Sequence, residues 1–183
     1  MALTHGLCDP MAAIDPAHFP RRPGPAFLLS HPAHFIALGL GTGLLRPGPG
    51  TWGTAAGWLM FVAVQQALRP PELVLALIGA VGLGLGTWAA GRAGTALGRP
   101  DAGEIVIDEI VSFWWVLVLL PAGPAPWTVQ LAAFLLFRLF DIAKPAPIGW
   151  LERRWPSAVG VMIDDLAAAA YTLLVIALWI RIP

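Results

Sequence analysis

The sequence contains little charge and a single cysteine. Charged residues make up 12% of the 183 residues, about half of the ~25% found in soluble domains. Hydrophobic residues make up 57%, and the mean hydropathy is +0.72, so we predict a membrane-embedded chain. Because Cys8 is the only cysteine, a disulfide framework, a cysteine zinc site and a CxxC redox pair are excluded within one chain. The formal net charge is zero, so we expect no nucleic-acid partner.

Histidine is also scarce and is confined to the N-terminal part. The four histidines all precede the first long apolar segment: His5, His18, His31 and His34. This position disfavours a histidine-rich zinc site or a histidine nucleophile among the apolar segments. The first thirty residues contain no continuous apolar run, so we predict no cleavable signal peptide. Their scattered Pro, His and Arg predict a disordered arm over residues 1–30, followed by one membrane-embedded domain over residues 31–183.

Five apolar segments are predicted to be helices: Gly53–Leu68, Leu73–Ala90, Ile105–Leu120, Trp127–Phe140 and Met162–Ile180. A full membrane span needs about 20 residues, so the shorter segments require their flanks or lie partly within protein. The stretch His34–Leu45 is too short and glycine-rich to span, and it predicts a re-entrant or interfacial helix. The expected fold is therefore an all-α, polytopic membrane bundle, with about five membrane-embedded helices plus this short N-terminal helix.

The distribution of basic residues predicts the topology. With five spans, nine Lys and Arg fall on one face and two on the other, and the positive-inside rule assigns the nine to the cytoplasm. The nine are Arg21, Arg22, Arg46, Arg92, Arg99, Arg138, Lys144, Arg153 and Arg154, and the two are Arg69 and Arg181. The acidic residues follow the same division, with Glu72 as the exception. Ionisable groups at membrane depth are costly and usually functional, so we expect the polar chemistry at the cytoplasmic face.

The stretch GEIVIDEIVSFWW places three carboxylates before an apolar run. Glu104 and Asp108 are four residues apart and are predicted to share a helix face, with Glu109 about 100° away. An acidic helix N-terminus favoured by the helix dipole explains Glu104 well and the other two poorly. Three neighbouring carboxylates repel one another unless a cation lies between them, so we expect a functional role here.

Two further stretches add charge near helix ends. In FRLFDIAKPAPI, Arg138 and Asp141 are three residues apart, and Lys144 follows by three. This spacing is either an ordinary intrahelical ion pair or a carboxylate between two cations, suited to a metal-bound phosphate. In GVMIDDLAAAAY, Asp164 and Asp165 are expected to open the last helix, as first-turn acids or as metal ligands. Ligands that are all carboxylate oxygens suit a hard cation, Mg²⁺ before Ca²⁺.

The loop LRPGPGTWGT precedes the first long apolar helix. Thr51 is predicted to be the N-cap of a helix beginning near Gly53. Glycines such as Gly50 let backbone N–H groups approach an anion at a helix N-terminus, and Arg46 adds a charge-assisted contact. The alternative is a tight re-entrant turn without a ligand. The loop is not a Walker A motif, because the G-K-[ST] ending is missing.

Taken together, these stretches predict a site for a phosphate on a lipid headgroup, bound through a divalent metal. Without a usable cysteine or histidine, two routes remain open for the chemistry. One is metal-assisted attack by water, and the other is an aspartate nucleophile that forms an acyl-phosphate.

The stretches RPGPGTWGT, IVIDEIVSFWW, FLLFRLFDIAKPAPI and GVMIDDLAAAAYT resemble, in order and spacing, the motifs of the phosphatidylglycerophosphatase A family. The resemblance implies an all-helical, Mg²⁺-dependent enzyme of the bacterial inner membrane. Such an enzyme hydrolyses phosphatidylglycerophosphate to phosphatidylglycerol and phosphate in phospholipid biosynthesis, and its active site would face the cytoplasm. The candidate catalytic residues are Asp108, Glu109, Asp141, Asp164 and Asp165. The candidate metal ligands are Glu104, Asp108, Glu109, Asp141 and Asp164. The candidate phosphate-binding residues are Arg46, Gly50, Thr51, Thr54, Arg138 and Lys144.

Three other interpretations are open at this stage. A cation-coupled transporter would also use buried acids, but it would place some of them on both faces. A non-catalytic assembly subunit would use small-residue helix faces, and Gly79–Gly94 supplies such a face, for packing within the chain or for a homo-oligomer. A phosphatase of another lipid, such as phosphatidic acid, would use the same chemistry.

Overall fold

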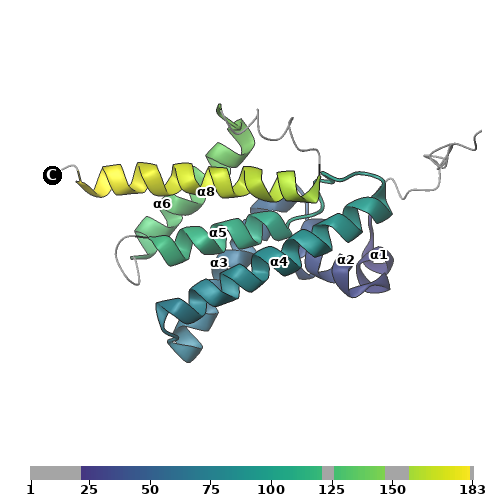
Figure 1. Cartoon of the computed structure of the whole chain (residues 1–183), viewed down its shortest axis with the longest axis horizontal. Helices are drawn as coiled ribbons and strands as arrows, with labels where there is room; N and C mark the ends of the chain where they lie inside the picture. The colour runs from purple at the N-terminus through teal and green to yellow at the C-terminus, as the bar shows by residue number, and fades with distance from the viewer. Residues whose placement is uncertain (1–21, 121–125, 147–156, 182–183) are drawn as a thin grey trace, which may run out of the picture.

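The structure is a computed structural model that describes residues 22–120, 126–146 and 157–181, and all regular structure within these residues is helical. The elements are α1 Pro25–Ser30, α2 Pro32–Ala37, the 3-10 helix η2 Gly39–Leu44, α3 Pro49–Leu68, α4 Glu72–Leu97, α5 Ile107–Leu119, α6 Trp127–Ala143 and α8 Ala158–Arg181. Each of the five predicted apolar segments lies mainly in one of the long helices α3, α4, α5, α6 and α8 (Figure 1). The predicted all-α class is confirmed.

The ends of α3 and α4 follow from local sequence. Pro49 occupies the first turn of α3, where its fixed φ suits a helix start, and Gly48 before it is left-handed with φ 68°. Arg69 ends α3 in a left-handed conformation, and two prolines follow. Helix α4 then ends at Gly98, whose φ of 65° forms the C-cap that glycine adopts without strain.

Helix α5 forms the centre of the bundle. It packs against α3, α4, α6 and α8, and Figure 1 shows it between α4 and α8. Glycines on α3 permit its close approach to α3, because a Cβ on Gly57 would lie 3.1 Å from the Cα of Ile110. Phe113, at the middle of α5, is fully buried and contacts the rings of Phe134 and Phe137 at 5.8 and 5.5 Å between centroids.

Exposed apolar stripes cover the outside of the bundle. On α6 the exposed large side chains recur every three or four residues: Trp127, Leu131, Leu135, Leu139 and Ile142. On α4 the same spacing holds for Leu73, Leu77, Val81, Leu85 and Trp88. A surface helix in water carries polar residues on its outward stripe, so these outer faces are suited to an apolar surrounding.

Within the described residues, two helices are long and apolar enough to cross a membrane: α4, and residues Ala158–Ile180 of α8. Helix α5, with 13 residues, rises only about 20 Å, short of the ~30 Å hydrocarbon core. The prediction of about five membrane-embedded helices is therefore not confirmed, although five long helices are present in the described residues.

The N-terminal region differs in part from its prediction. Residues Pro25–Ser30 form the short helix α1, within the arm over residues 1–30 that was predicted to be disordered. The stretch His34–Leu45 forms the end of α2 and then η2, with left-handed residues Leu40 and Gly41 inside η2. Residues 1–21, with Cys8, and residues 147–156, with the cations Arg153 and Arg154 of the topology prediction, lie outside the described residues.

Candidate active site

The first turn of α5 carries two acidic side chains into the bundle. Asp108 is 5% exposed, and the Glu109 backbone N–H donates to Asp108 Oδ1 at 3.1 Å. The helix begins at Ile107, later than predicted, because the Val106 N–H donates to the Ala37 carbonyl at 2.9 Å instead of continuing a helix backwards. The predicted shared helix face of Glu104 and Asp108 is therefore wrong.

Helix α8 brings a third carboxylate to the same place. It begins at Ala158, so Asp164 and Asp165 lie in its second turn and do not open it, contrary to the prediction. Both are buried, at 3% and 5% exposure. The helix dipole acts mainly on the first turn, so it does not account for this buried pair.

Asp108, Glu109 and Asp165 form a compact cluster, which we call the acidic cluster. One oxygen from each side chain lies within 4.8 Å of the others. Glu109 Oε2 and Asp165 Oδ2 are buried and have no hydrogen-bond partner among the described residues. Buried carboxylates of like charge are unfavourable unless a cation neutralises them. Three hard carboxylate oxygens this close together are the kind of ligand set that suits a Mg²⁺ ion.

Arg138, from the last turns of α6, borders the acidic cluster. Its Nη1 lies 3.6 Å from Glu109 Oε1 and 2.6 Å from Asp141 Oδ2, and it donates to Thr54 Oγ1 at 3.4 Å. Its Nε is buried without a partner among the described residues. The predicted Arg138–Asp141 pair is present, and it lies within a site to which α3, α5 and α6 contribute. The Asp141 carboxylate is also close enough to act electrostatically on Asp165.

The start of α3 reaches the same site through Gly50 and Thr54. A Cβ on Gly50 would collide with Glu109 Oε1 and lie 3.0 Å from both terminal nitrogens of Arg138. Thr54 is fully buried, and its hydroxyl donates to the Gly50 carbonyl at 2.8 Å. Thr51 is exposed and is not the N-cap, which is Gly48. The predicted cap is wrong because Pro49 already starts the helix.

Lys144 pairs with α8. Its Nζ lies 3.9 Å from Asp164 Oδ2, so the structure places it beside Asp164, whereas the sequence spacing had suggested a carboxylate between Arg138 and Lys144. Lys144 is the C-cap residue of α6, in a left-handed conformation with φ 40°. The turn therefore directs a cation towards the second turn of α8.

Glu104 lies outside the acidic cluster. It precedes α5 and is 8% exposed by side chain, with Arg46 Nη2 at 3.0 Å and Arg99 Nη2 at 3.4 Å. Both of its oxygens are occupied by guanidinium groups. The structure thus places Glu104 and Arg46 in an ion-pair network that ties the α3 loop to the end of α4, and this differs from their expected roles as metal ligand and phosphate contact.

One polar residue of the site region was not singled out from the sequence. Ser112 is fully buried one turn after Asp108, and its Oγ has no hydrogen-bond partner among the described residues. In the stretch DEIVS, Ser112 follows Asp108 by four residues, so the two side chains share a helix face. This spacing could have identified Ser112 from the sequence.

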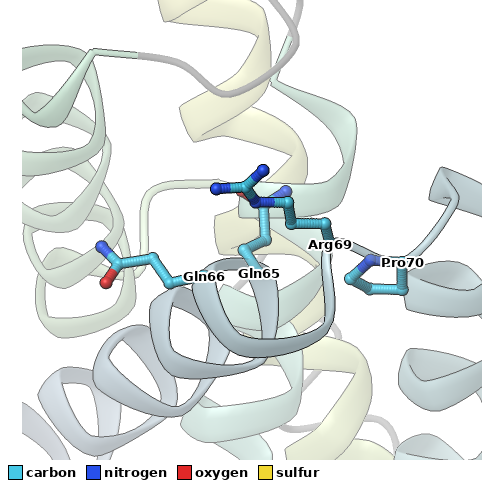
Figure 2. Close-up of a pocket in the computed structure, with 4 residues that line it drawn as sticks. All are labelled: Gln65, Gln66, Arg69 and Pro70. Atoms are coloured by element: carbon cyan, nitrogen blue, oxygen red, sulfur yellow. The ribbon is translucent and has the colours of Figure 1, made fainter.

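A separate hollow of about 650 Å³ lies at the other end of α3, lined by Gln65, Gln66, Arg69 and Pro70. Figure 2 shows the side chains of Gln65 and Arg69 extending to the same side of the turn, with Gln66 directed away. Gly50 and Arg69 are nineteen residues apart, which corresponds to about 28 Å along a helix. This hollow is therefore not part of the acidic cluster.

Comparison with known proteins supports one family. Residues 35–180 match the sequence model of the family described as Phosphatidylglycerophosphatase A. A phosphatidylglycerophosphatase A of Haemophilus influenzae is 38% identical over 148 residues, covering 81% of this chain and 88% of its own. The Escherichia coli protein of the same name is 34% identical over 140 residues, with 76% and 78% covered. A Bacteroides thetaiotaomicron protein whose name proposes phosphatidylinositol-3-phosphatase activity is 33% identical over 144 residues, with 78% and 89% covered.

No solved structure matches the chain significantly. The family match includes α3, α5 and α6 in full and α8 up to Ile180, so it contains the acidic cluster and Arg138. The resemblance noted in the sequence is confirmed, and the chain belongs to the phosphatidylglycerophosphatase A family.

Proposed function

We propose that the chain hydrolyses phosphatidylglycerophosphate to phosphatidylglycerol and inorganic phosphate. In this reaction the terminal P–O ester bond breaks, water supplies the new oxygen on phosphorus, and the lipid leaves as its alcohol. The observation that carries the proposal is the buried acidic cluster beside Arg138, in which Glu109 Oε2, Asp165 Oδ2 and Arg138 Nε have no hydrogen-bond partner within the described part of the chain.

The acidic cluster is suited to Mg²⁺. Asp108, Glu109 and Asp165 would hold the ion, and Asp141 lies near enough to add charge. A bound Mg²⁺ supplies charge neutralisation on phosphate oxygens and activation of water. Asp108, Glu109 and Asp165 repel one another while they are buried and charged, and a bound cation would remove that repulsion.

The remaining groups bind and orient the phosphate. Arg138 offers guanidinium donors to the phosphoryl oxygens, where charge develops in the transition state. Asp141 and Thr54 fix the orientation of Arg138 through its Nη1. Lys144 adds a second positive charge near Asp164. The attacking group is either water or one of the aspartates, and both routes use the same positions.

We further propose that the chain is a multi-pass protein of the bacterial inner membrane, with this site at the cytoplasmic face. The support comes from the apolar outer stripes, the two span-length helices and the asymmetric distribution of Lys and Arg. The lipid headgroup is proposed from the names of the two relatives called phosphatidylglycerophosphatase A.

The test is phosphate release by purified protein in nanodiscs. Substrates are phosphatidylglycerophosphate, phosphatidic acid and phosphatidylinositol 3-phosphate, each with Mg²⁺ and with excess EDTA. We expect release that requires Mg²⁺ and is fastest with phosphatidylglycerophosphate, and Asp108→Asn should abolish it while the protein remains folded. Faster release from another lipid would reassign the headgroup. No release from any lipid, in protein with cooperative thermal unfolding, would refute the phosphatase and favour a transporter.

A further inference from the structure

An apolar groove of about 460 Å³ runs along one side of α5. Its floor is made of α5 side chains, among them Ile107, Ile110 and Trp114. Its walls are α3, including Ala63, and α4, including Gly82. The groove has almost no polar surface, so it is suited to a hydrocarbon ligand.

Small residues let α4 pack closely against α5 along the groove. At Gly79 a Cβ would lie 3.0 Å from the Trp115 ring and 3.1 Å from Trp114 Cδ1, and at Gly82 it would lie 3.3 Å from Val111 Cγ2. Larger side chains at these positions would push α4 away from α5. Trp114 is held in place because its Nε1 donates to the Leu75 carbonyl at 3.0 Å. The position of Trp114 in the groove is therefore set by a hydrogen bond to α4 as well as by packing.

The groove begins at the helical turn that carries the carboxylates. In the first turn of α5, Ile107 and Ile110 flank the two acidic residues in sequence. Trp114 lies seven residues beyond Ile107, which is about 10 Å along the helix. Ala63 on α3 and Ile78 on α4 line the groove and are also exposed. The groove therefore links the polar end of the bundle to its apolar outer surface.

We infer that the groove holds one acyl chain of the lipid monophosphate whose phosphate binds at the acidic cluster, an inference that rests on the proposed function. A phosphate and its acyl chain are covalently joined, so one lipid occupies both places at once. In a bilayer the acyl chain already lies in hydrocarbon, and its transfer into the groove adds little affinity. The contribution of the groove is to fix the depth and orientation of the phosphate.

The first test measures occupancy directly. A lipid monophosphate with a diazirine in the middle of one acyl chain is photolysed with the full chain in nanodiscs of neutral lipid. We expect labelling of peptides around Ala63 and Gly82 that unlabelled lipid monophosphate suppresses and neutral diacylglycerol does not. Labelling that is spread equally over the outer stripe of α6, or that resists competition, would mean annular lipid only and would overturn the inference.

The second test separates the acyl chain from the phosphate. The ratio of kcat/KM for the diacyl lipid to kcat/KM for a chain-free glycerol phosphate ester is compared between Ala63→Phe and Ala80→Phe. Ala80 is exposed on α4 and does not line the groove. We expect Ala63→Phe to lower the ratio at least tenfold and Ala80→Phe to preserve it. An unchanged ratio for Ala63→Phe, whether activity on both substrates falls equally or stays the same, would refute the binding of an acyl chain in the groove. If the wild-type protein releases no phosphate from either substrate, the proposed function fails, and the photolabelling result still decides the groove.

Discussion

Replacing Gly50 with alanine tests whether the start of α3 sets the geometry of the site. The backbone at Gly50 is regular helix, with no positive φ, so alanine meets no backbone strain there. The added Cβ would collide with Glu109 Oε1 and press on both terminal nitrogens of Arg138. Carbon and oxygen atoms pack at roughly 3.5 Å, so the Glu109 carboxylate must retreat by more than about 1 Å.

The expected effect on catalysis is large, whereas the effect on stability is small. Misplacement of a catalytic group by about 1 Å costs on the order of 100-fold in rate, so Gly50→Ala should lower kcat/KM by about two orders of magnitude. Local crowding costs about 1–3 kcal/mol, and the gain from replacing a helical glycine with alanine, about 0.5–1 kcal/mol, offsets part of this. The assay is Mg²⁺-dependent phosphate release alongside thermal unfolding in the same detergent.

A matched control is available on α4. A Cβ on Gly84 would meet nothing within 4 Å, so Gly84→Ala should keep full activity and raise the stability slightly. Activity of Gly50→Ala within twofold of wild type would refute the assignment of Glu109 and Arg138 to the site, because the collision involves both.

Four further predictions concern individual charges. Asp165→Asn should lower phosphate release at least 100-fold. In EDTA it should also raise the free energy of unfolding by about 1–2 kcal/mol, because it relieves repulsion in the acidic cluster. A lower unfolding temperature of the variant in EDTA would contradict this. Arg138→Lys keeps the charge but loses the planar donors, so kcat should fall about 10- to 100-fold, measured by steady-state kinetics. Glu104→Gln should leave the Mg²⁺ concentration for half-maximal activity unchanged. It should lower the free energy of unfolding by about 1–2 kcal/mol, since Glu104 binds Arg46 and Arg99. A raised Mg²⁺ requirement would instead indicate that Glu104 is a metal ligand. Arg181→Ala should keep near-wild-type activity, because Arg181 is sixteen residues beyond Asp165, which is about 24 Å along α8. A large loss of phosphate release would refute the predicted placement of Arg181 on the far face.

The sequence was sufficient to predict the long helices and most of the site. Apolar runs of this length between prolines and glycines predict helices, and acidic residues beside such runs are costly enough to indicate function. Asp108, Glu109 and Arg138 were found in this way, and the structure brings them together. These residues were recognisable because each is a charged side chain within or beside an apolar helix, where a charge is unfavourable.

The first residues of the helices and the long-range ion pairs were harder to predict from the sequence. The start of α8 at Ala158 precedes the acidic pair by six residues, and the available signal for it was Ser157, whose Oγ accepts from the Gly160 N–H at 3.4 Å. Glu104 binds Arg46, which is 58 residues away, and such a contact depends on how α3 and α4 pack. The start of α3 is marked in the sequence, since a proline at the first helical position is a typical start signal, and Pro49 overrides the capping preference of Thr51.

The site is assembled from helix ends that no single segment specifies. Helix α5 contributes its first turn, α6 its last two turns, α8 its second turn and α3 its first turn. The relative depth of α3 and α5 is fixed by a glycine face, because a Cβ on Gly53 would lie 2.7 Å from the Val106 side chain and one on Gly57 would touch the backbone of Ile110. The same face continues to Gly50, which lies against Glu109 and Arg138. The small residues of α3 therefore do more than allow two helices to pack closely: they also leave room for the Glu109 carboxylate and the Arg138 guanidinium beside the start of α3. If these two groups act in catalysis as proposed, a change in this glycine face should alter activity before it unfolds the bundle.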